Sequence, residues 1–520
     1  MDWIERNRRY GLYCPEFRFG LNTAGMKFDE SDIAAMEPKF RAAHDGMTAI
    51  ESGAVKNPDE NRKVTHFTDR VSYLGSELFN SVKDFADRIA AGTIVSASGK
   101  KFTQAVINGI GGSALGPQLM QFAVNGPYWN ELSDAARRGY LKIYFLDNTD
   151  SSGVTDLLPV MDLESTLVVT ISKSGGTQET KNNLTALEQI FAAAGIDLAK
   201  QSAVITMNGS NLYKYAAEKN YLRIFEMAES IGGRTSETSV VGHLPAALAG
   251  IDFGAFLAGA CKMDKWTRIT DYDSNPAYML AAMWYIAGSG RGDRNMVIVP
   301  YSDRLLLLSR YLQQLVMESL GKELDLDGKV VHQGLNVFGN KGGTDAHAFI
   351  QQLNDGRDDF FITFIEVLKD AKKFDMGGGM AMGDYLHGFL EGLSAALRGK
   401  GRQVIRITID ELTPETLGML IALYERAVAV YAEFIHINAF HQPGVQAYKL
   451  AAKGILKLRD EFFAKMHELA PIEGDATALA GAAGCGDHAV EIAGLLAKAA
   501  VNGIVEREFV DCAWVYKFRK

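Results

Sequence analysis

The sequence predicts an α/β fold of doubly wound parallel sheets with additional helical arms. The main observation is that short apolar runs alternate with helical segments in two blocks, residues 101–270 and 271–470. Such alternation is typical of a parallel sheet with helices on both faces. A chain of 520 residues is also too long for one hydrophobic core, so we expect one α/β domain in each block.

The first block supplies five expected strands. Each is a short, mostly apolar run, as expected for strands that are buried on both faces. We place them at residues 105–108, 141–146, 166–171, 203–207 and 222–225. Helices predicted at 116–123 and 153–160 follow two of these strands, which favours parallel connections.

The second block repeats this alternation. Its expected strands are residues 296–300, 335–338, 360–366 and 404–409, and its expected helices are 304–317 and 384–398. Long helices follow between residues 414 and 469. The two blocks could be diverged copies, although the sequence alone shows no sharp repeat.

The flanking segments are expected to be accessory. Residues 1–100 predict a mostly helical arm or cap, with 72–91 the best amphipathic segment. Residues 471–485 are rich in Ala and Gly and predict a loose linker, and residues 487–520 predict a helix followed by an extended segment. We expect residues 471–520 to pack on the domains as a C-terminal tail.

Composition and charge exclude several classes of protein. With 47% apolar and 22% charged residues the chain is typical of a soluble globular protein. A net charge of -9 argues against nucleic-acid and anionic-membrane partners. No apolar run approaches the ~20 residues of a membrane span, and the N-terminus lacks the apolar core of a secretory signal. The four cysteines share no metal or disulfide spacing, so we expect a cytoplasmic protein without a metal site.

Residues 168–180, VVTISKSGGTQET, form the most informative stretch. A β-branched strand runs into a turn of Ser, Lys, Gly and Thr residues, and a helix follows. Glycines let a ligand approach the backbone, while hydroxyls and the N–H groups of the helix N-terminus favour an anion. The sequence therefore predicts a phosphate-binding turn. The alternative is an ordinary helix N-cap, because Ser and Thr are also good caps.

A second glycine turn, GIGGSALGP, starts at Gly109 and follows the first strand of the first block. It matches the dinucleotide-binding pattern G-x-G-x-x-A, which requires an acidic residue ~20 positions later at the end of the next strand. That strand ends at Asp147, which is too distant. We therefore interpret the turn as a second anion site, with Ser113 facing the ligand at the carboxyl edge of the sheet.

Two charged residues lie in suggestive positions. Arg234 follows Gly232 and Gly233, and its guanidinium is a fixed fork of donors suited to an oxyanion, although a solvated surface turn explains the pattern equally well. Glu318 ends an apolar helix, where partial burial can raise the pKa of a carboxyl group towards that of a useful base. The alternative interpretation is a structural salt bridge between Glu318 and Lys322, four residues on.

Two further turns each open a helix. GNKGGTDAHAF places His347 in a first helical turn, and FHQPGVQAYK places Lys449 in a second turn. Taken alone, a structural histidine and a surface lysine explain these positions.

In this order, the motifs GIGGSALGP, ISKSGGTQET, GGRTS, QQLVMESLGK, GNKGGTDAHAF and FHQPGVQAYK resemble those of glucose-6-phosphate isomerases. They span residues 109–449. The resemblance implies two sugar-isomerase (SIS-type) domains, a homodimer, and interconversion of glucose 6-phosphate and fructose 6-phosphate without a metal or redox cofactor.

Site roles follow from the same resemblance. The residues implied to bind the sugar phosphate are Gly112, Ser113, Ser172, Lys173, Ser174, Thr177, Gln314 and Gln442. Glu318 is the implied base, Arg234 stabilises the enediolate, and His347 and Lys449 assist ring opening. The histidine is implied to come from the neighbouring subunit, with Glu179 orienting it.

The sequence departs from the family pattern at three positions. Ala346 stands where Gln is common, and Gln446 and Tyr448 replace Glu and Gly beside the lysine. We expect these three replacements to change the local packing and the pH behaviour of the site.

The rival classes of protein are an NAD-dependent oxidoreductase, for which no ribose-binding acid is found, and a non-catalytic sugar-phosphate sensor, which does not require all four catalytic residues. Acceptance of mannose 6-phosphate is a further alternative.

Overall fold

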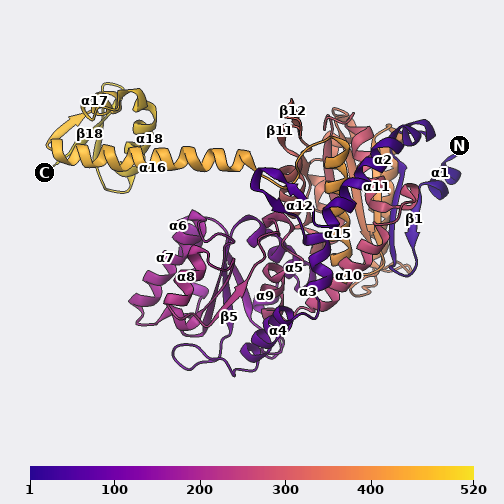
Figure 1. Cartoon of the computed structure of the whole chain (residues 1–520), viewed down its shortest axis with the longest axis horizontal. Helices are drawn as coiled ribbons and strands as arrows, with labels where there is room; N and C mark the ends of the chain where they lie inside the picture. Colours follow the sequence, from indigo (N-terminus) through magenta and orange to yellow (C-terminus); the bar gives the residue numbers. More distant parts are fainter. Residues whose placement is uncertain (520) are drawn as a thin grey trace. The chain divides into compact units, whose positions relative to one another are not determined.

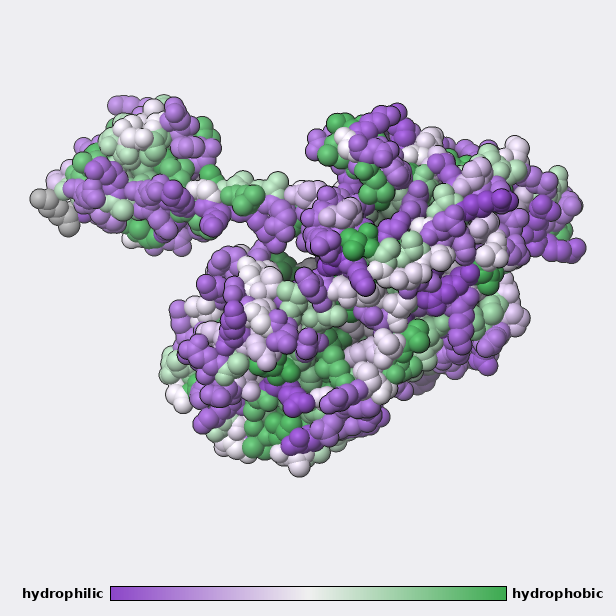
Figure 2. Space-filling model, in the orientation of Figure 1, coloured by the Kyte–Doolittle hydropathy of each residue, from purple (hydrophilic) through white to green (hydrophobic). Residues whose placement is uncertain are grey.

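The computed structural model describes residues 1–519, and the chain divides into two compact units, residues 1–441 and 442–520. The long helix α16 (Pro443–Leu469) belongs to the C-terminal unit, whereas the sequence placed these residues with the second α/β domain. Hydrophilic residues cover most of the visible surface of each unit (Figure 2). No helix of residues 1–519 is both long and apolar enough to cross a bilayer.

The first sheet is fully parallel. Its five strands are β5 (Gln104–Asn108), β6 (Lys142–Leu146), β7 (Thr166–Ile171), β8 (Ser202–Thr206) and β9 (Arg223–Glu226), in the order β6-β5-β7-β8-β9. All five expected strands are present to within two residues. Their local sequence was informative because strands buried on both faces are continuous apolar runs.

Helices cover both faces of this sheet, as Figure 1 shows. On one face, α5 (Leu115–Asn125) packs its Leu119 and Met120 side chains in the same core as Ile107. On the opposite face, α6 (Ser151–Leu157), α7 (Gln178–Ala193) and α8 (Asn211–Glu218) bury side chains against Val106 and Val168. The sheet is therefore doubly wound, with a switch point between β5 and β7.

The second sheet has six strands in the order β1-β2-β15-β14-β10-β13. The strands β10 (Asn295–Tyr301), β13 (Val337–Phe338), β14 (Phe360–Val367) and β15 (Gln403–Ile409) are parallel. In both sheets the second strand lies on one side of the first and the third strand returns to the other side. This shared topology supports the view that the two blocks are diverged copies.

The N-terminal segment is mostly helical, as expected, but it also contributes strands to the second sheet that the sequence did not predict. β1 (Gly11–Cys14) and β2 (Phe19–Gly25) form an antiparallel hairpin, and β2 pairs antiparallel with β15. A Cβ atom at Gly25 would lie 2.6 Å from the carbonyl oxygen of Val404, so glycine permits this close pairing. The remaining elements of this segment include α1 (Trp3–Arg9), α2 (Glu30–Glu51), β3 (Val55–Asn57), β4 (Arg62–Lys63), α3 (His66–Tyr73) and α4 (Glu77–Ala90).

One hydrophobic core joins the two sheets. It contains residues of both, for example Ile107 and Ile298, together with the helices α9 (Val240–Leu248), α10 (Phe253–Trp266), α11 (Pro276–Ala287) and α15 (Pro414–Phe434). Helix α15 is buried on all sides, which agrees with its almost continuous apolar sequence. The loops of both sheets are therefore held in one compact body.

The helix expected at residues 304–317 has a different form. It comprises a short α-helix, α12 (Leu308–Leu312), followed by a π-helical turn, η10 (Gln313–Glu318). Such turns interrupt the regular ladder of hydrogen bonds and occur frequently at functional sites. The other expected helix of this block is α14 (Met382–Gly399).

The C-terminal unit has its own core, built from the end of α16 with α17 (Ala476–Ala482), α18 (Ala489–Val501) and the strands β16 (Ile472–Gly474), β17 (Glu506–Val510) and β18 (Ala513–Phe518). Phe462, Met466, Ile492 and Leu496 are buried in it. The expected loose linker at 471–485 is wrong, since it contains β16 and α17. Their alanines are small enough to pack closely, so an Ala- and Gly-rich composition did not indicate a loop.

Candidate active site

The first phosphate-type turn follows β7 at the carboxyl edge of the first sheet. Ser172 donates a hydrogen bond to the Thr177 hydroxyl at 3.2 Å, and the Gly176 N–H donates to Ser174 Oγ at 3.2 Å. Gly175 has φ +68°, and a Cβ atom there would lie 2.3 Å from the backbone nitrogen of Leu212. Only glycine fits at this position, which explains the first glycine of the Gly pair between the hydroxyl residues.

The Lys173 side chain leaves this turn and contacts a different segment. Its ammonium donates to the carbonyl oxygen of Ile231 at 2.9 Å and to that of Glu229. Burial, together with the nearby charge of Arg62, lowers the pKa of Lys173 to about 8. The side chain therefore ties the first turn to the segment that precedes Arg234, and only the backbone of Lys173 is available to a ligand in the turn.

The second turn follows β5, the neighbour of β7, and contains the 3₁₀ turn η2 (Gly111–Ser113). Because Asn108 and Thr170 are paired in register, both turns leave the same edge at the switch point. Gly112 lies directly against the Arg234-bearing turn, since a Cβ atom there would be 1.9 Å from the carbonyl oxygen of Gly233. Gly111 lies against the Gln314 side chain, since a Cβ atom at Gly111 would be 3.0 Å from Gln314 Nε2.

Arg234 is buried, with 7% of its side chain exposed, and it contacts Glu318. Its Nη1 lies 3.3 Å from Glu318 Oε1, and its Nε donates to Ser319 Oγ at 2.8 Å. Its Nη2 donates to the carbonyl oxygens of Ala439 (2.7 Å) and His441 (3.0 Å). These contacts exclude the alternative of a solvated surface arginine and fix the guanidinium in one orientation.

Glu318 ends the π-helical turn η10, and its two carboxylate oxygens differ. Oε1 faces Arg234, whereas Oε2 is buried and has no hydrogen-bond partner among the described residues. The alternative partner Lys322 instead donates to the backbone carbonyl of Glu318, at 2.7 Å. One oxygen of the carboxylate therefore retains the capacity to accept a proton.

Basic side chains surround this pair. Burial, with a further contribution from Arg234, lowers the pKa of Lys322 to about 7. Burial also lowers the pKa of His441, whose Nε2 lies 3.5 Å from Asp59 Oδ2. An anion bound here would meet a fixed cation at Arg234 and a weakly held proton at Lys322.

His347 lies at the end of the 3₁₀ turn η11 (Thr344–His347), after β13, and its side chain is exposed. The buried Asp345 carboxylate shapes the turn by accepting hydrogen bonds from the Asn340 backbone N–H (2.9 Å) and side chain (3.1 Å). Glu179 occupies the first turn of α7. Within residues 1–519 of one chain, no hydrogen bond or ion pair joins Glu179 to His347.

Gln442 and Lys449 belong to the C-terminal unit. Gln442 immediately precedes α16, and Lys449 lies in the second turn of this helix with its side chain half-buried. Tyr448, one of the three departures from the family pattern, is 55% exposed. The first unit brings together the two turns, Gln314, Arg234 and Glu318.

An N-terminal brace of the site was not found from the sequence. Arg62 pairs with Glu60 at 2.9 Å and donates to the carbonyl oxygens of Ser230 and Phe440, both at 3.0 Å. Asn57 also donates to the Phe440 carbonyl, at 3.0 Å. These contacts hold both segments that surround Arg234. No local motif marks residues 55–63, so only the three-dimensional structure reveals their role.

The described residues 1–519 contain no group of three or more His, Cys, Asp or Glu side chains that could hold a metal ion. The fold, with a buried Arg–Glu pair beside two phosphate-type turns, places the chain among the sugar-phosphate isomerases. A family model described as phosphoglucose isomerase matches residues 41–406 and 393–468, so the chain belongs to the phosphoglucose isomerase family. It is therefore an enzyme.

Individual relatives agree with this assignment. The chain is 46% identical over 470 residues to a glucose-6-phosphate isomerase of Citrifermentans bemidjiense, covering 88% of this chain and 87% of the relative. It is also 46% identical to the chloroplastic glucose-6-phosphate isomerase 1 of Arabidopsis thaliana, covering 90% and 76%. The crystal structure of a Chlamydia trachomatis glucose-6-phosphate isomerase superposes with a TM-score of 0.77 at 26% identity, covering 88% and 91%.

Proposed function

We propose that this enzyme interconverts glucose 6-phosphate and fructose 6-phosphate by moving a proton between C1 and C2 through a cis-enediolate. The observation that carries the proposal is the Arg234–Glu318 pair, in which one carboxylate oxygen is bound and the other has no partner. This pair lies beside two turns that suit a phosphate group. Relatives at 46% identity that carry the name of this activity support it.

In the proposed binding mode, the two turns hold the phosphate. The Ser113, Ser172, Ser174 and Thr177 hydroxyls and the backbone N–H groups of Gly112 and Lys173 donate to its oxygens. The N-terminus of α7 adds a favourable dipole. Gln314, which lies against the second turn at Gly111, then contacts the sugar, as does Gln442.

Glu318 performs the proton transfer. Its carboxylate takes the proton from C2 of the open-chain aldose, the electron pair forms the C1–C2 double bond of the enediolate, and the aldehyde oxygen takes up the negative charge. The proton of the C2 hydroxyl group then moves to O1, and return of the carbon-bound proton from Glu318 to C1 leaves the carbonyl group at C2 and yields the ketose. Arg234 stabilises the enediolate oxygens, because its guanidinium is already fixed by Ser319 and two backbone carbonyls.

Ring opening is assigned to His347 and Lys449. A proton must reach the ring oxygen while another leaves the anomeric hydroxyl, and an imidazole and an ammonium are suitable acid–base groups. In the proposal, His347 enters the site of a second copy, where Glu179 orients it. Glu179 is suitably placed because it directly follows the phosphate turn.

A second copy of the chain is the proposed cover for the surface beside His347. A hollow of about 630 Å³ is lined by Thr344, His347 and Phe389, among others. Exposed apolar side chains cluster in the adjoining segment, namely Leu368, Phe374, Met376, Met380, Met382, Tyr385 and Phe389, with exposures from 41% to 61%. Apolar patches of this kind mark protein interfaces.

We also propose a cytoplasmic location, because the four cysteines are free thiols, as is usual in a reducing compartment.

The decisive experiment is a coupled assay on fructose 6-phosphate with the Glu318→Gln variant. We expect turnover to collapse while sugar-phosphate affinity stays close to wild type, because Gln keeps the shape but cannot accept the proton. Glu323→Gln, an exposed carboxylate five residues on, is the matched control and should retain full activity. Wild-type turnover by Glu318→Gln would show that another group is the base. Repeating the assay with mannose 6-phosphate tests substrate breadth.

Sharing of His347 is tested by complementation. Glu318→Gln and His347→Ala are each expected to be nearly inactive, but their co-expression produces mixed dimers in which one site has both wild-type residues. About a quarter of wild-type activity should return if the histidine is donated by the partner. No recovery, despite mixed dimers detected by differential tagging, would place His347 in the site of its own chain.

A further inference from the structure

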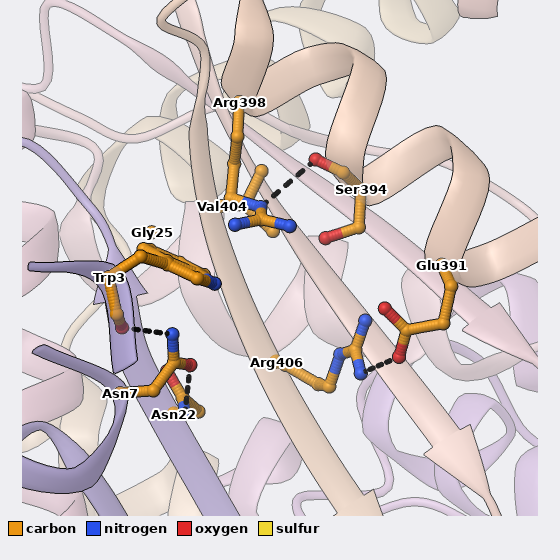
Figure 3. A pocket seen from close by; sticks show the side chains of 9 residues that line it. All are labelled: Trp3, Asn7, Asn22, Gly25, Glu391, Ser394, Arg398, Val404 and Arg406. Atoms are coloured by element: carbon orange, nitrogen blue, oxygen red, sulfur yellow. Dashed lines mark hydrogen bonds and ion pairs between the residues drawn. The ribbon is translucent and has the colours of Figure 1, made fainter. Parts of the chain in front are cut away.

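A cleft that is not lined by Arg234 or Glu318 lies where the N-terminal segment packs beside α14 and β15. It consists of two adjoining hollows of about 160 and 470 Å³, which share Trp3, Gly25 and Arg398 as lining residues. Figure 3 shows the smaller hollow, with Trp3 on one side and side chains of α14 on the other. The cleft therefore has a narrow chamber and a wider, more open one.

The lining of this cleft is strongly cationic. The two hollows are lined by five cationic side chains and one carboxylate, Glu391; the cations are Arg6, Lys27, Arg398, Arg402 and Arg406. This excess occurs in a chain whose net charge is -9. Like charges brought together repel one another, so the arrangement favours an anionic ligand in the cleft.

The nearby acids neutralise these cations only in part. Glu391 pairs with Arg406, and Glu366 Oε2 lies 3.8 Å from Arg406 Nη1. Asp358 serves three cations at once, with Arg294 at 2.8 Å and both Lys27 and Arg402 at 3.4 Å. Negative charge is therefore in short supply on both sides of the cleft.

Two of the arginines have mainly structural contacts. Arg6 donates to the carbonyl oxygens of Ala24, Met26 and Phe28 at 2.7 to 2.9 Å. Arg402 donates to the carbonyl oxygens of Asn354 and Gly356. They hold the walls of the cleft in place.

Arg398 is different, because its end nitrogens project into the narrow chamber. Its Nε donates to the Ser394 carbonyl at 3.2 Å, and its guanidinium lies over the Trp3 ring at 4.0 Å from the ring centroid, as Figure 3 shows. Among residues 1–519 it forms no ion pair with a carboxylate within 4 Å, and Glu391 attracts it only from a longer distance. Partial burial and the charge of Arg406 lower the pKa of Arg398, so a bound anion would relieve an existing repulsion.

We propose that this cleft binds a small organic phosphate ester, with its phosphoryl group between Arg398 and Arg406 and its remaining part in the wider hollow beside Trp3 and Lys27. A phosphoryl group matches the planar fork of an arginine and fits the narrow chamber. The half-exposed Trp3 indole offers an apolar face for the rest of the ligand. The ligand would connect α1 to α14 at a site separate from the catalytic pair.

The test uses Trp3 as a local reporter on the full-length chain, with inorganic pyrophosphate as the probe. In the wild-type protein, pyrophosphate should cause a saturable change in tryptophan emission. This change should be lost in Trp3→Phe, although calorimetry should still detect binding of pyrophosphate to that variant. Arg398→Gln should weaken the calorimetric binding at least about tenfold, because a charge-assisted bidentate contact is lost. Pyrophosphate bound at the catalytic turns would leave the Trp3 signal unchanged, so the two sites are distinguished.

The matched control is Arg9→Gln, an exposed arginine on the same helix as Trp3, which pairs with Glu30 at 3.2 Å and does not line the cleft. It should bind pyrophosphate like wild type. Equal weakening by Arg9→Gln and Arg398→Gln would show unspecific charge screening and overturn the proposal. The same conclusion follows if no Trp3-dependent signal appears, or if only Ser174→Ala abolishes binding. Binding of long polyphosphate but not of pyrophosphate would point to a polymeric anion instead.

Discussion

Replacing Gly112 by Ala should separate the two turns that form the site. A Cβ atom at Gly112 would lie 1.9 Å from the Gly233 carbonyl oxygen, 2.1 Å from its carbonyl carbon and 2.8 Å from its Cα. Non-bonded heavy atoms normally approach to about 3.5 Å, with slightly shorter contacts to oxygen. The two backbone segments must therefore move apart by more than about 1 Å, and neither is a flexible side chain that can rotate away.

This displacement acts directly on the chemistry. The Gly233 turn carries Arg234, which holds Glu318, while Gly112 belongs to the turn assigned to the phosphate. A misplacement of about 1 Å can cost about 10²-fold in rate, which is close to 2.7 kcal/mol of transition-state stabilisation. Overpacking should also lower the free energy of unfolding by about 1–3 kcal/mol.

The assay measures kcat and KM with fructose 6-phosphate, together with thermal unfolding. Gly233→Ala is the matched control, because a Cβ atom there meets no other atom within 4 Å. It should retain near-wild-type activity. If folded Gly112→Ala keeps activity within about twofold of wild type, the close contact between the turns does not set the catalytic geometry, and the reasoning fails.

Three further outcomes are expected. Arg234→Lys keeps the positive charge but cannot reproduce the contacts of the guanidinium with Ser319 and Glu318, so kcat should fall by about 10²–10³-fold with little change in KM. A change confined to KM would contradict the role of Arg234 in stabilising the enediolate. The pKa of Lys322 is lowered to about 7 in the folded chain, so above pH 7 the unfolded chain binds more protons than the folded chain does. The free energy of unfolding should therefore rise between pH 7 and pH 10. Urea unfolding of Lys322→Met should show a weaker dependence of this free energy on pH, and an unchanged slope would exclude Lys322 as its source. Burial raises the pKa of Glu237 in the folded chain, so the stability of the wild-type protein should decrease as the pH rises above about 4.5. The thermal midpoint of Glu237→Gln should exceed that of wild type by more at pH 8 than at pH 5. A difference in thermal midpoint that does not depend on pH would contradict this.

The first sheet could be predicted from the sequence because its signal is local. Buried parallel strands such as β7 are continuous apolar runs, and the Gly- and Ser-rich turns directly follow them. Elements whose stability depends on distant partners could not be predicted. Strand β2 has a mixed sequence, FGLNTAG, and becomes a strand by pairing with β15. The π-helical turn at Glu318 also has no local signature.

At the site, the motifs identified which residues to consider but not their partners. Sequence spacing suggested Lys322 for the Glu318 carboxylate, whereas the structure pairs it with Arg234 from a different segment. Arg234 alone was equally compatible with a surface turn, because its burial depends on Ser319, Ala439 and His441. The catalytic roles of His347 and Lys449 stay predictions.

The pairing of β2 with β15 has a consequence for synthesis on the ribosome. β1 pairs with one edge of β2 within the hairpin, but β15, which pairs with the other edge, is completed about 380 residues later. At about 5–20 residues per second, β2 waits roughly 20–80 s with unpaired backbone groups. During this interval its exposed edge is open to pairing with another nascent chain. Fusions or deletions at the N-terminus should therefore affect the yield of folded protein more than changes of similar size in surface loops.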